Sequence, residues 1–355
     1  MKTDSYQKLA QHLDRLPGGF PPSDSGAEWR LLKRLFKPDE AELAIHLTLD
    51  REEARVIAGR AGLDLAKAEP RLKEMARQGL IFSIEPEGGP ILYQAVPWIV
   101  GIYEFQVNNL NEGFVQEVNE YMRTRGKPSR PQPIPQLRTI PVQRSIQHLL
   151  ETLSYERAEE LVKAQEKLAV APCLCRRKAK IMNAGCDAPE ETCLMFGDWA
   201  DYYVRNGLGR FIDQAEAMEI LTEADQANLV LQPSNSRDVT FMCCCCGCCC
   251  ALLTRLKLHP KPSEQVASPF IAKAELETCE GCGVCADRCQ MEAVTLGDGR
   301  VVLNSARCIG CGLCVSTCPT GSLTLVRKPA QEHIKVPITM DDTWRELSQV
   351  WKNRA

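Results

Sequence analysis

A four-cysteine spacing that occurs twice near the C-terminus constrains this chain more than any other feature. The pattern C-x2-C-x2-C-x3-C covers Cys279, Cys282, Cys285 and Cys289, and it recurs at Cys308, Cys311, Cys314 and Cys318. A tight loop with thiolates three residues apart can cap three corners of a cubane [4Fe-4S] cluster, so the fourth ligand must come from elsewhere. Zinc ribbons do not need such dense spacing together with a distant fourth ligand. The repeat therefore predicts two [4Fe-4S] clusters rather than a pair of structural zinc sites.

The segments ETCEGCGVCADRCQMEAV and ARCIGCGLCVSTCPTGSL resemble bacterial two-cluster ferredoxins. The resemblance implies that the two loops exchange one ligand each. Cys279, Cys282, Cys285 and Cys318 would then hold one cluster, and Cys308, Cys311, Cys314 and Cys289 the other. Gln290 stands where the family has a proline, which predicts a different exit from the first loop without affecting ligation. Clusters capped by thiolate at every iron have no open site for a substrate, so single-electron transfer is the expected role.

Eleven further cysteines lie between Cys173 and Cys250, and they predict additional metal sites. The first four are Cys173, Cys175, Cys186 and Cys193. Residues two apart on a strand share a face, so Cys173 and Cys175 can serve one centre. Arg176 and Arg177 would offset the negative charge of the thiolates. We interpret this set as a cluster site, with buried free thiols as the alternative.

The remaining seven belong to the run CCCCGCCC, which no packing requirement explains. They are Cys243, Cys244, Cys245, Cys246, Cys248, Cys249 and Cys250. Free thiols this close would oxidise in air, so the run indicates an anaerobic or reducing setting. If the run is extended, Cys243 and Cys245 face one centre, and Cys244 and Cys246 another. We expect one or two further iron–sulfur clusters, and surplus thiols, outer-shell groups or a larger non-cubane cluster remain open alternatives.

The chain before Cys173 has no cysteine and must form an ordinary core. Helical patterns around 29–36, 38–47, 51–62 and 70–78 precede two strand-like runs around Gly88, an order typical of a winged helix. The helix around 70–78 would be the DNA-reading helix of a winged helix. Its positive charge from Arg71, Lys73 and Arg77 is offset by acidic neighbours, so we interpret this domain as a protein-docking module. We expect no nucleic-acid partner.

These patterns together predict an α+β protein. We expect a winged-helix-like domain over 1–125, a proline-rich linker over 126–145, a mainly helical cysteine-rich cluster-binding region over 146–271, a two-cluster ferredoxin domain over 272–328 and a C-terminal tail over 329–355. The N-terminus lacks the apolar segment of a signal peptide, and the longest apolar stretch is too short to span a bilayer. We therefore expect a cytoplasmic protein without membrane insertion.

Over most of its length the chain looks like a group of multi-cluster iron–sulfur proteins of anaerobic bacteria. The likeness lies in LPGGFPP, APCLCRRK, ETCLMFGDWADYYVRNGLGR, the cysteine run and CIGCGLCVSTCPTGSL. It implies electron transfer in anaerobic metabolism, as a carrier or subunit rather than a stand-alone enzyme. A redox partner such as a flavoprotein or an oxidoreductase complex would exchange the electrons.

Two other functions remain as alternatives at this stage. The first is a reductase subunit with a catalytic or non-cubane cluster in the central region, for which Asp198, Tyr202 and Tyr203 are candidate lining residues. Their simpler interpretation is helix packing. The second is a redox-sensing winged-helix regulator that binds DNA.

Overall fold

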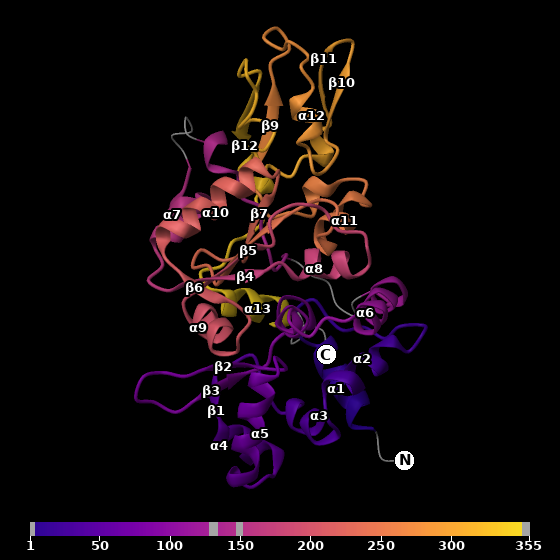
Figure 1. The fold of residues 1–355 in the computed structure, drawn as a ribbon, viewed down its shortest axis with the longest axis vertical. Coiled ribbons are helices and arrows are strands. Elements are labelled where there is room, and N and C mark those ends of the chain that lie inside the picture. The colour runs from indigo at the N-terminus through magenta and orange to yellow at the C-terminus, as the bar shows by residue number, and fades with distance from the viewer. Residues whose placement is uncertain (1–3, 128–133, 147–151, 350–355) are drawn as a thin grey trace.

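The computed structural model describes residues 4–127, 134–146 and 152–349. The N-terminal helices lie at one end of an elongated molecule, a central sheet lies in the middle, and the ferredoxin-like region lies at the other end (Figure 1). Helices and small antiparallel sheets are mixed, which agrees with the predicted α+β class. Within the described ranges, no helix is long and apolar enough to cross a lipid bilayer.

The N-terminal part contains the predicted helices and hairpin. Its helices are α1 (Ser5–Asp14), α2 (Ala27–Leu35), α3 (Pro38–Ala44), α4 (Ala54–Ala61), α5 (Leu65–Arg77) and α6 (Glu112–Thr124). The strands β1 (Glu52–Glu53), β2 (Phe82–Ile84) and β3 (Leu92–Gln94) form an antiparallel sheet in the order β1-β3-β2. Leu32, Leu72 and Met75 are fully buried, so the apolar faces of α2 and α5 point into one core.

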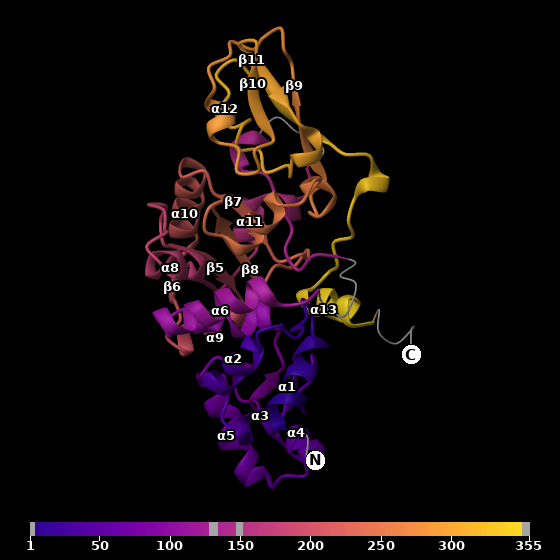
Figure 2. The same ribbon diagram turned by 90° about the vertical axis from the view of Figure 1, so that its right-hand side faces the viewer.

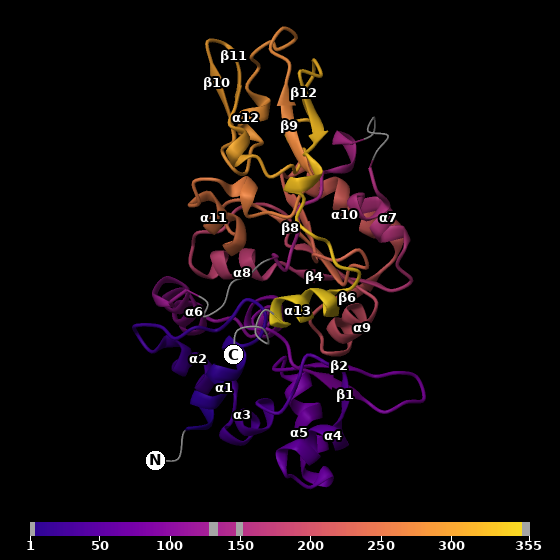
Figure 3. The same ribbon diagram turned by 180° about the vertical axis from the view of Figure 1, so that it is seen from behind.

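The central region is organised around a five-stranded antiparallel sheet that the sequence did not reveal. Its strands are β4 (Leu168–Pro172), β5 (Glu191–Phe196), β6 (Arg210–Ile212), β7 (Val230–Pro233) and β8 (Phe241–Cys245), in the order β6-β4-β5-β8-β7. The region predicted to be mainly helical therefore combines this sheet with the helices α7 (Ala158–Lys163), α8 (Leu174–Ile181), α9 (Asp198–Arg205), α10 (Gln214–Gln226) and α11 (Ala251–Lys257). These helices surround the sheet (Figure 3).

The two faces of this sheet belong to different cores. Val170, Leu194 and Met242 pack in the core that also contains α7 and α10. Met195 and Phe241 lie on the opposite face, in the core shared with α9 and the N-terminal helices. This period-two alternation decides which cysteines of β8 can meet.

The joint between the N-terminal part and the sheet is closed by α9 and the C-terminal helix α13 (Met340–Gln349). The Tyr202 hydroxyl donates to the carbonyl oxygens of Ala76 and Ile81, at 2.8 and 2.9 Å. The ring of Trp344, which is 1% exposed, lies 6.3 Å from that of Trp199. The region predicted as a tail thus contains a packed helix, seen beside the joint in Figure 2.

Residues 134–146 run along the central sheet. The Ile140 amide donates to the Leu231 carbonyl of β7 at 3.2 Å, and the Val142 amide donates to the Cys311 carbonyl at 3.0 Å. The prolines predicted to form the linker fall partly in 128–133, outside the described residues. The described part of the segment therefore contacts both the sheet and the ferredoxin-like region.

The ferredoxin-like region pairs β9 (Phe270–Ala274) with β12 (Leu323–Arg327), and β10 (Val294–Gly297) with β11 (Arg300–Leu303), and it contains the short helix α12 (Val284–Asp287). A buried ion pair attaches it to the central region. Arg288 Nη2 lies 2.6 Å from Asp225 Oδ1 near the end of α10, and both side chains are about nine-tenths buried.

Candidate iron–sulfur and thiol sites

The eight ferredoxin-type cysteines line two separate cavities. The first cavity is lined by Cys279, Cys282, Cys285 and Cys318, and the second by Cys289, Cys308, Cys311 and Cys314. These are the two sets that the resemblance implied, including the exchanged cysteines. Gly281, Gly283, Gly310 and Gly312, which lie between these cysteines, have φ values from 67° to 83°. Glycine reaches this backbone region without strain, which lets the loops wrap tightly.

Backbone amides point at several of these sulfurs. The amides of Ala293, Ala272 and Val301 lie 3.1, 3.3 and 3.4 Å from the Sγ atoms of Cys289, Cys308 and Cys279, respectively. Such N–H···S contacts stabilise thiolates and tune bound clusters. Burial raises the pKa of Cys311 to about 12, so this thiol would ionise on binding metal rather than alone. The donor set and the cavities therefore fit two cubane clusters.

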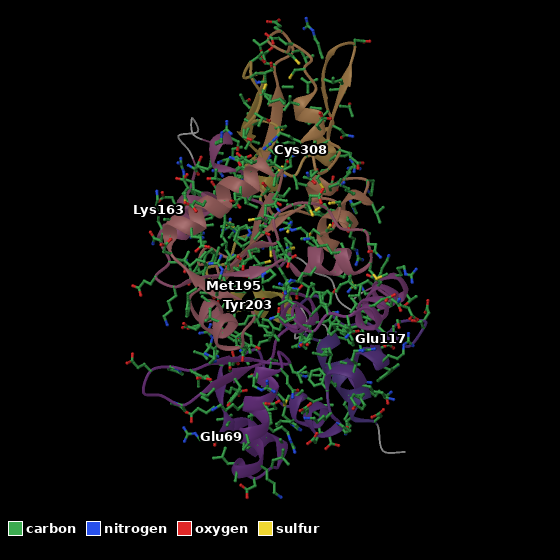
Figure 4. All side chains as sticks on the ribbon, viewed as in Figure 1. Glu69, Glu117, Lys163, Met195, Tyr203 and Cys308 are labelled. Atoms are coloured by element: carbon green, nitrogen blue, oxygen red, sulfur yellow. The ribbon has the colours of Figure 1, made fainter. Side chains whose placement is uncertain are left out.

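The two cavities differ in exposure. Cys282 of the first set is exposed, whereas Cys308 and Cys314 of the second set are buried. Cys308 lies where the ferredoxin-like region meets the central region, as Figure 4 shows. The first set is thus the outer one, and the second faces the centre of the molecule.

Six cysteines of the central region form a closed ring, in which each thiol has two neighbours that shift its pKa. In order around the ring they are Cys173, Cys193, Cys243, Cys245, Cys250 and Cys175. We call this set the six-thiol ring. The contact with Cys173 raises the pKa of Cys175 and of Cys193, because neighbouring buried thiols cannot all carry charge. A bound metal centre would supply the compensating positive charge.

Strand register and helix starts bring the ring together. Cys193 and Cys243 are directly paired across β5 and β8, with their sulfurs 3.7 Å apart. Cys173 and Cys250 are the N-cap residues of α8 and α11, where free backbone amides favour a thiolate. The strand assumed for the C-x-C pair is not found, because β4 ends at Pro172 and α8 begins at Leu174. The two thiols nevertheless share one site.

Four other cysteines form a second, more compact set, which we call the knuckle group. Cys186, Cys246, Cys248 and Cys249 have their sulfurs within 4.8 Å of one another. Burial favours the neutral thiol of Cys246, but the Cys249 amide, Cys248 and Arg176 outweigh it and lower its pKa to about 7. This thiol is therefore partly ionised at neutral pH without metal.

Cys244 belongs to neither set. Side chains alternate along β8, so Cys244 lies on the same face as Met242 and points away from Cys243 and Cys245. Burial raises its pKa to about 12. The expected pairing of Cys243 with Cys245 is thus seen, whereas Cys244 and Cys246 are not brought together, since β8 ends at Cys245 and the chain turns.

Arg176 lies between the six-thiol ring and the knuckle group. Its side chain is 0% exposed, and Nη1 lies 3.8 Å from the Cys246 sulfur. Nη1 and Nη2 also donate to the Cys244 carbonyl, both at 3.2 Å. Burial opposes its charge, but the thiolates of Cys173, Cys246 and Cys193 raise its pKa. Arg177, the other predicted cation, instead pairs with Glu190.

Gln290 connects the ferredoxin-like region to the cysteine run. Its side-chain Oε1 accepts a hydrogen bond of 2.6 Å from the Gly247 amide. A Cβ atom at Gly247 would lie 2.7 Å from this oxygen and 2.8 Å from the Gln290 carbonyl oxygen. The unusual residue after Cys289 therefore lies against the glycine between Cys246 and Cys248, and the two cysteine regions are in direct contact.

Two titratable side chains in the surroundings of the ring, Tyr103 and Glu104, could not be recognised from the sequence, whereas Tyr203 was already a candidate lining residue. Cys175 and Glu104 add to burial in raising the pKa of Tyr103, whose buried hydroxyl has no hydrogen-bond partner among the described residues. Burial raises the pKa of Glu104 to about 7, although its Oε2 accepts from the Gly101 amide at 2.9 Å. Burial also raises the pKa of Tyr203, with Cys193 adding to the effect. Tyr203 lies next to the central sheet in Figure 4.

The candidate lining residues of α9 pack as their simpler interpretation predicts. Asp198 pairs with Arg51 at 2.9 Å, and the rings of Tyr202 and Tyr203 pack tilted and edge-on against Phe105, respectively. On α5, Arg71 pairs with Asp39 and Arg77 with Glu74, both at 2.6 Å.

One protein family matches part of the chain. Residues 271–331 match the family model of the 4Fe-4S dicluster domain, which covers both ferredoxin-type cavities. The comparison with curated proteins finds no match.

Proposed function

Because this is an iron–sulfur protein with a C-terminal ferredoxin-like region, we propose that it transfers single electrons between that region and a metal centre held by the six-thiol ring. One observation carries the proposal: the second ferredoxin-type set continues into the central cysteines through Gln290 and Gly247. When bound, iron–sulfur clusters on these cysteines accept and donate one electron at a time. The chain supplies the ligands, the buried surroundings and the fixed spacing.

The route through the protein follows from burial. Exposed Cys282 would face a partner at the outer end, and the buried second set would lie next in line. Arg176 would stabilise the central thiolates electrostatically, since a buried cation favours additional negative charge nearby. The six-thiol ring would be the inner terminus of the route, between the sheet and the N-terminal part.

The N-terminal part would be the docking module. The order β1, α4, α5, β2, β3 supports a winged-helix assignment. The ion pairs of Arg71 and Arg77 neutralise the cations that would bind a DNA backbone. This favours a protein partner, such as a flavoprotein or an oxidoreductase of anaerobic metabolism.

The proposal is tested with protein purified without oxygen. Iron and acid-labile sulfide are measured per chain for the wild type and for a Cys193→Ser, Cys243→Ser double variant, together with electron paramagnetic resonance during reductive titration. We expect the wild type to hold more than the eight irons of two cubanes, and the variant to lose the irons of the ring while it keeps those eight. Wild-type protein with eight irons, unchanged in the variant, would rule out the route to the ring.

A reductase role is a second candidate, favoured by Tyr103, which interacts with Cys175 of the ring, and by the neighbouring Glu104. An acid that titrates near neutrality can deliver protons during reduction of a substrate. The test adds oxidised compounds and follows the electron paramagnetic resonance signal of the ring. A signal that changes in the wild type but not in Glu104→Gln would support the reductase role. A signal insensitive to every added compound leaves electron transfer as the function.

A further inference from the structure

The knuckle group has a different geometry from every other cysteine set in the described chain. Its Sγ–Sγ distances are 3.8 Å for Cys186–Cys246, 3.7 Å for Cys186–Cys249 and 3.7 Å for Cys248–Cys249. All four sulfurs lie within 4.8 Å of one another. The sulfurs thus surround a point rather than a cavity.

Such spacing matches one tetrahedral ion. With metal–sulfur bonds of about 2.3 Å, the edge of a tetrahedron of thiolates is about 3.8 Å. A cubane places each thiolate on a separate iron at its own corner, so its ligands must stand further apart. The same protein shows this alternative at the ferredoxin-type sets, where each set of four cysteines lines a cavity instead of surrounding a point.

The surroundings also suit a single tetrathiolate centre. Four thiolates around one divalent ion carry a net charge of two minus, and Arg176 offers a buried guanidinium 3.8 Å from the Cys246 sulfur. Cys248 is exposed and Cys186 is partly exposed, so an ion can enter from solvent. Cys246 and Cys249 are buried, which closes the inner side.

From this geometry we infer that Cys186, Cys246, Cys248 and Cys249 bind one thiophilic metal ion, Zn²⁺ or iron, without sulfide. This site lies between the ferredoxin-like region and the six-thiol ring. Zinc would make it a structural clamp on the joint at Gly247, whereas iron would make it an additional one-electron centre.

The test compares full-length protein purified without oxygen in three forms. They are the wild type, the Cys186→Ser, Cys248→Ser double variant, and Cys244→Ala as a matched control from the same cysteine run. Zinc, iron and acid-labile sulfide are measured per chain. We expect the double variant to lose one metal ion and no sulfide, and the control to lose neither. The element that is lost decides between zinc and iron.

Loss of about four irons with four sulfides in the double variant would instead assign a cubane to these cysteines and overturn the inference. Unchanged metal content would overturn it as well. If the double variant does not fold, the absorption spectrum of wild-type protein produced in cobalt-supplemented medium tests the site instead. Absorption bands of tetrahedral cobalt thiolate support the site, and their absence contradicts it. The iron of the ferredoxin-like region, read in the same samples, is independent of either result.

Discussion

At the scale of single residues, Arg176 is the buried charge that both central thiol sets share. Replacing it by methionine keeps the volume but removes the positive charge, so reduction of a centre at the ring becomes less favourable. We expect the midpoint potential of the central signal to fall by about 60 mV or more, which is one decade in a one-electron equilibrium. A spectroscopic redox titration measures this.

Two other variants make that result specific. Arg176→Lys retains the charge and should recover most of the potential. Arg177→Met removes a cation that pairs with Glu190 and should leave the potential unchanged. Equal shifts in all three variants would show that the effect is structural rather than electrostatic.

Glu104 predicts a pH dependence of stability. Burial raises its pKa to about 7 in the folded protein, above the value of 4.5 expected when unfolded. The raised pKa contributes stability that is complete below pH 4.5 and is lost as the pH rises through about 7. Glu104→Gln cannot ionise, so it removes this loss of stability at higher pH, and its side-chain oxygen remains an acceptor for the Gly101 amide. Relative to the wild type, the variant should therefore gain on the order of 2 kcal/mol between pH 5 and 8.

Thermal unfolding without oxygen, followed from pH 5.5 to 8.5, measures the Glu104 effect. Glu87→Gln changes an exposed carboxylate of the hairpin and serves as the control. If Glu104→Gln and the wild type show parallel pH profiles, Glu104 does not titrate in this range.

At the scale of elements, the turn after β8 must approach the end of the first ferredoxin loop closely. Gly247→Ala would place a Cβ atom 2.8 Å from the Gln290 carbonyl oxygen, which is backbone and cannot rotate away. We expect a loss of about 1 to 3 kcal/mol in unfolding free energy, measured by denaturant titration. Gly59→Ala, within α4 and facing open space, should be neutral or stabilising. A Gly247→Ala protein as stable as the wild type would contradict the close contact.

The sequence predicted local elements better than their assembly. Helices α2 to α4 have apolar positions at helical spacing, so the sequence alone indicates them, whereas α5 begins at Leu65 instead of near Pro70 as predicted. The central sheet depends on pairing between strands far apart in the chain, such as Cys193 with Cys243, and local patterns do not encode register.

The same limit applies to the sites. The ferredoxin-type sets follow from a repeated spacing, and their grouping in two cavities agrees with the resemblance. The division of the central cysteines into a ring, a compact set and the separate Cys244 depends on where β8 ends, which the uniform run of cysteines conceals. Gln290 was noticed as a departure from the family, but its contact with Gly247 required the fold.

At the scale of the whole molecule, the ion pair of Arg288 and Asp225 holds the ferredoxin-like region on the central region. Removing one partner of a buried pair leaves an uncompensated charge, at a cost of about 3 to 5 kcal/mol. Asp225→Ala should therefore lower the unfolding midpoint and accelerate proteolysis of the ferredoxin-like region.

The exposed pair of Lys261 and Glu264 provides the control for this change, because surface pairs contribute about 0 to 1 kcal/mol. Glu264→Ala should leave both measurements unchanged. Proteolysis at the wild-type rate in Asp225→Ala would mean that other contacts suffice to hold the region in place.

The packing of α13 against α9 imposes an order on biosynthesis. Trp344 inserts next to Trp199, at a joint whose other side is formed by the first hundred residues. The ribosome releases those residues long before it makes Trp344, so the nascent N-terminal part waits with an apolar surface uncovered. The late arrival of one tryptophan thus makes this joint one of the last parts of the molecule to be completed.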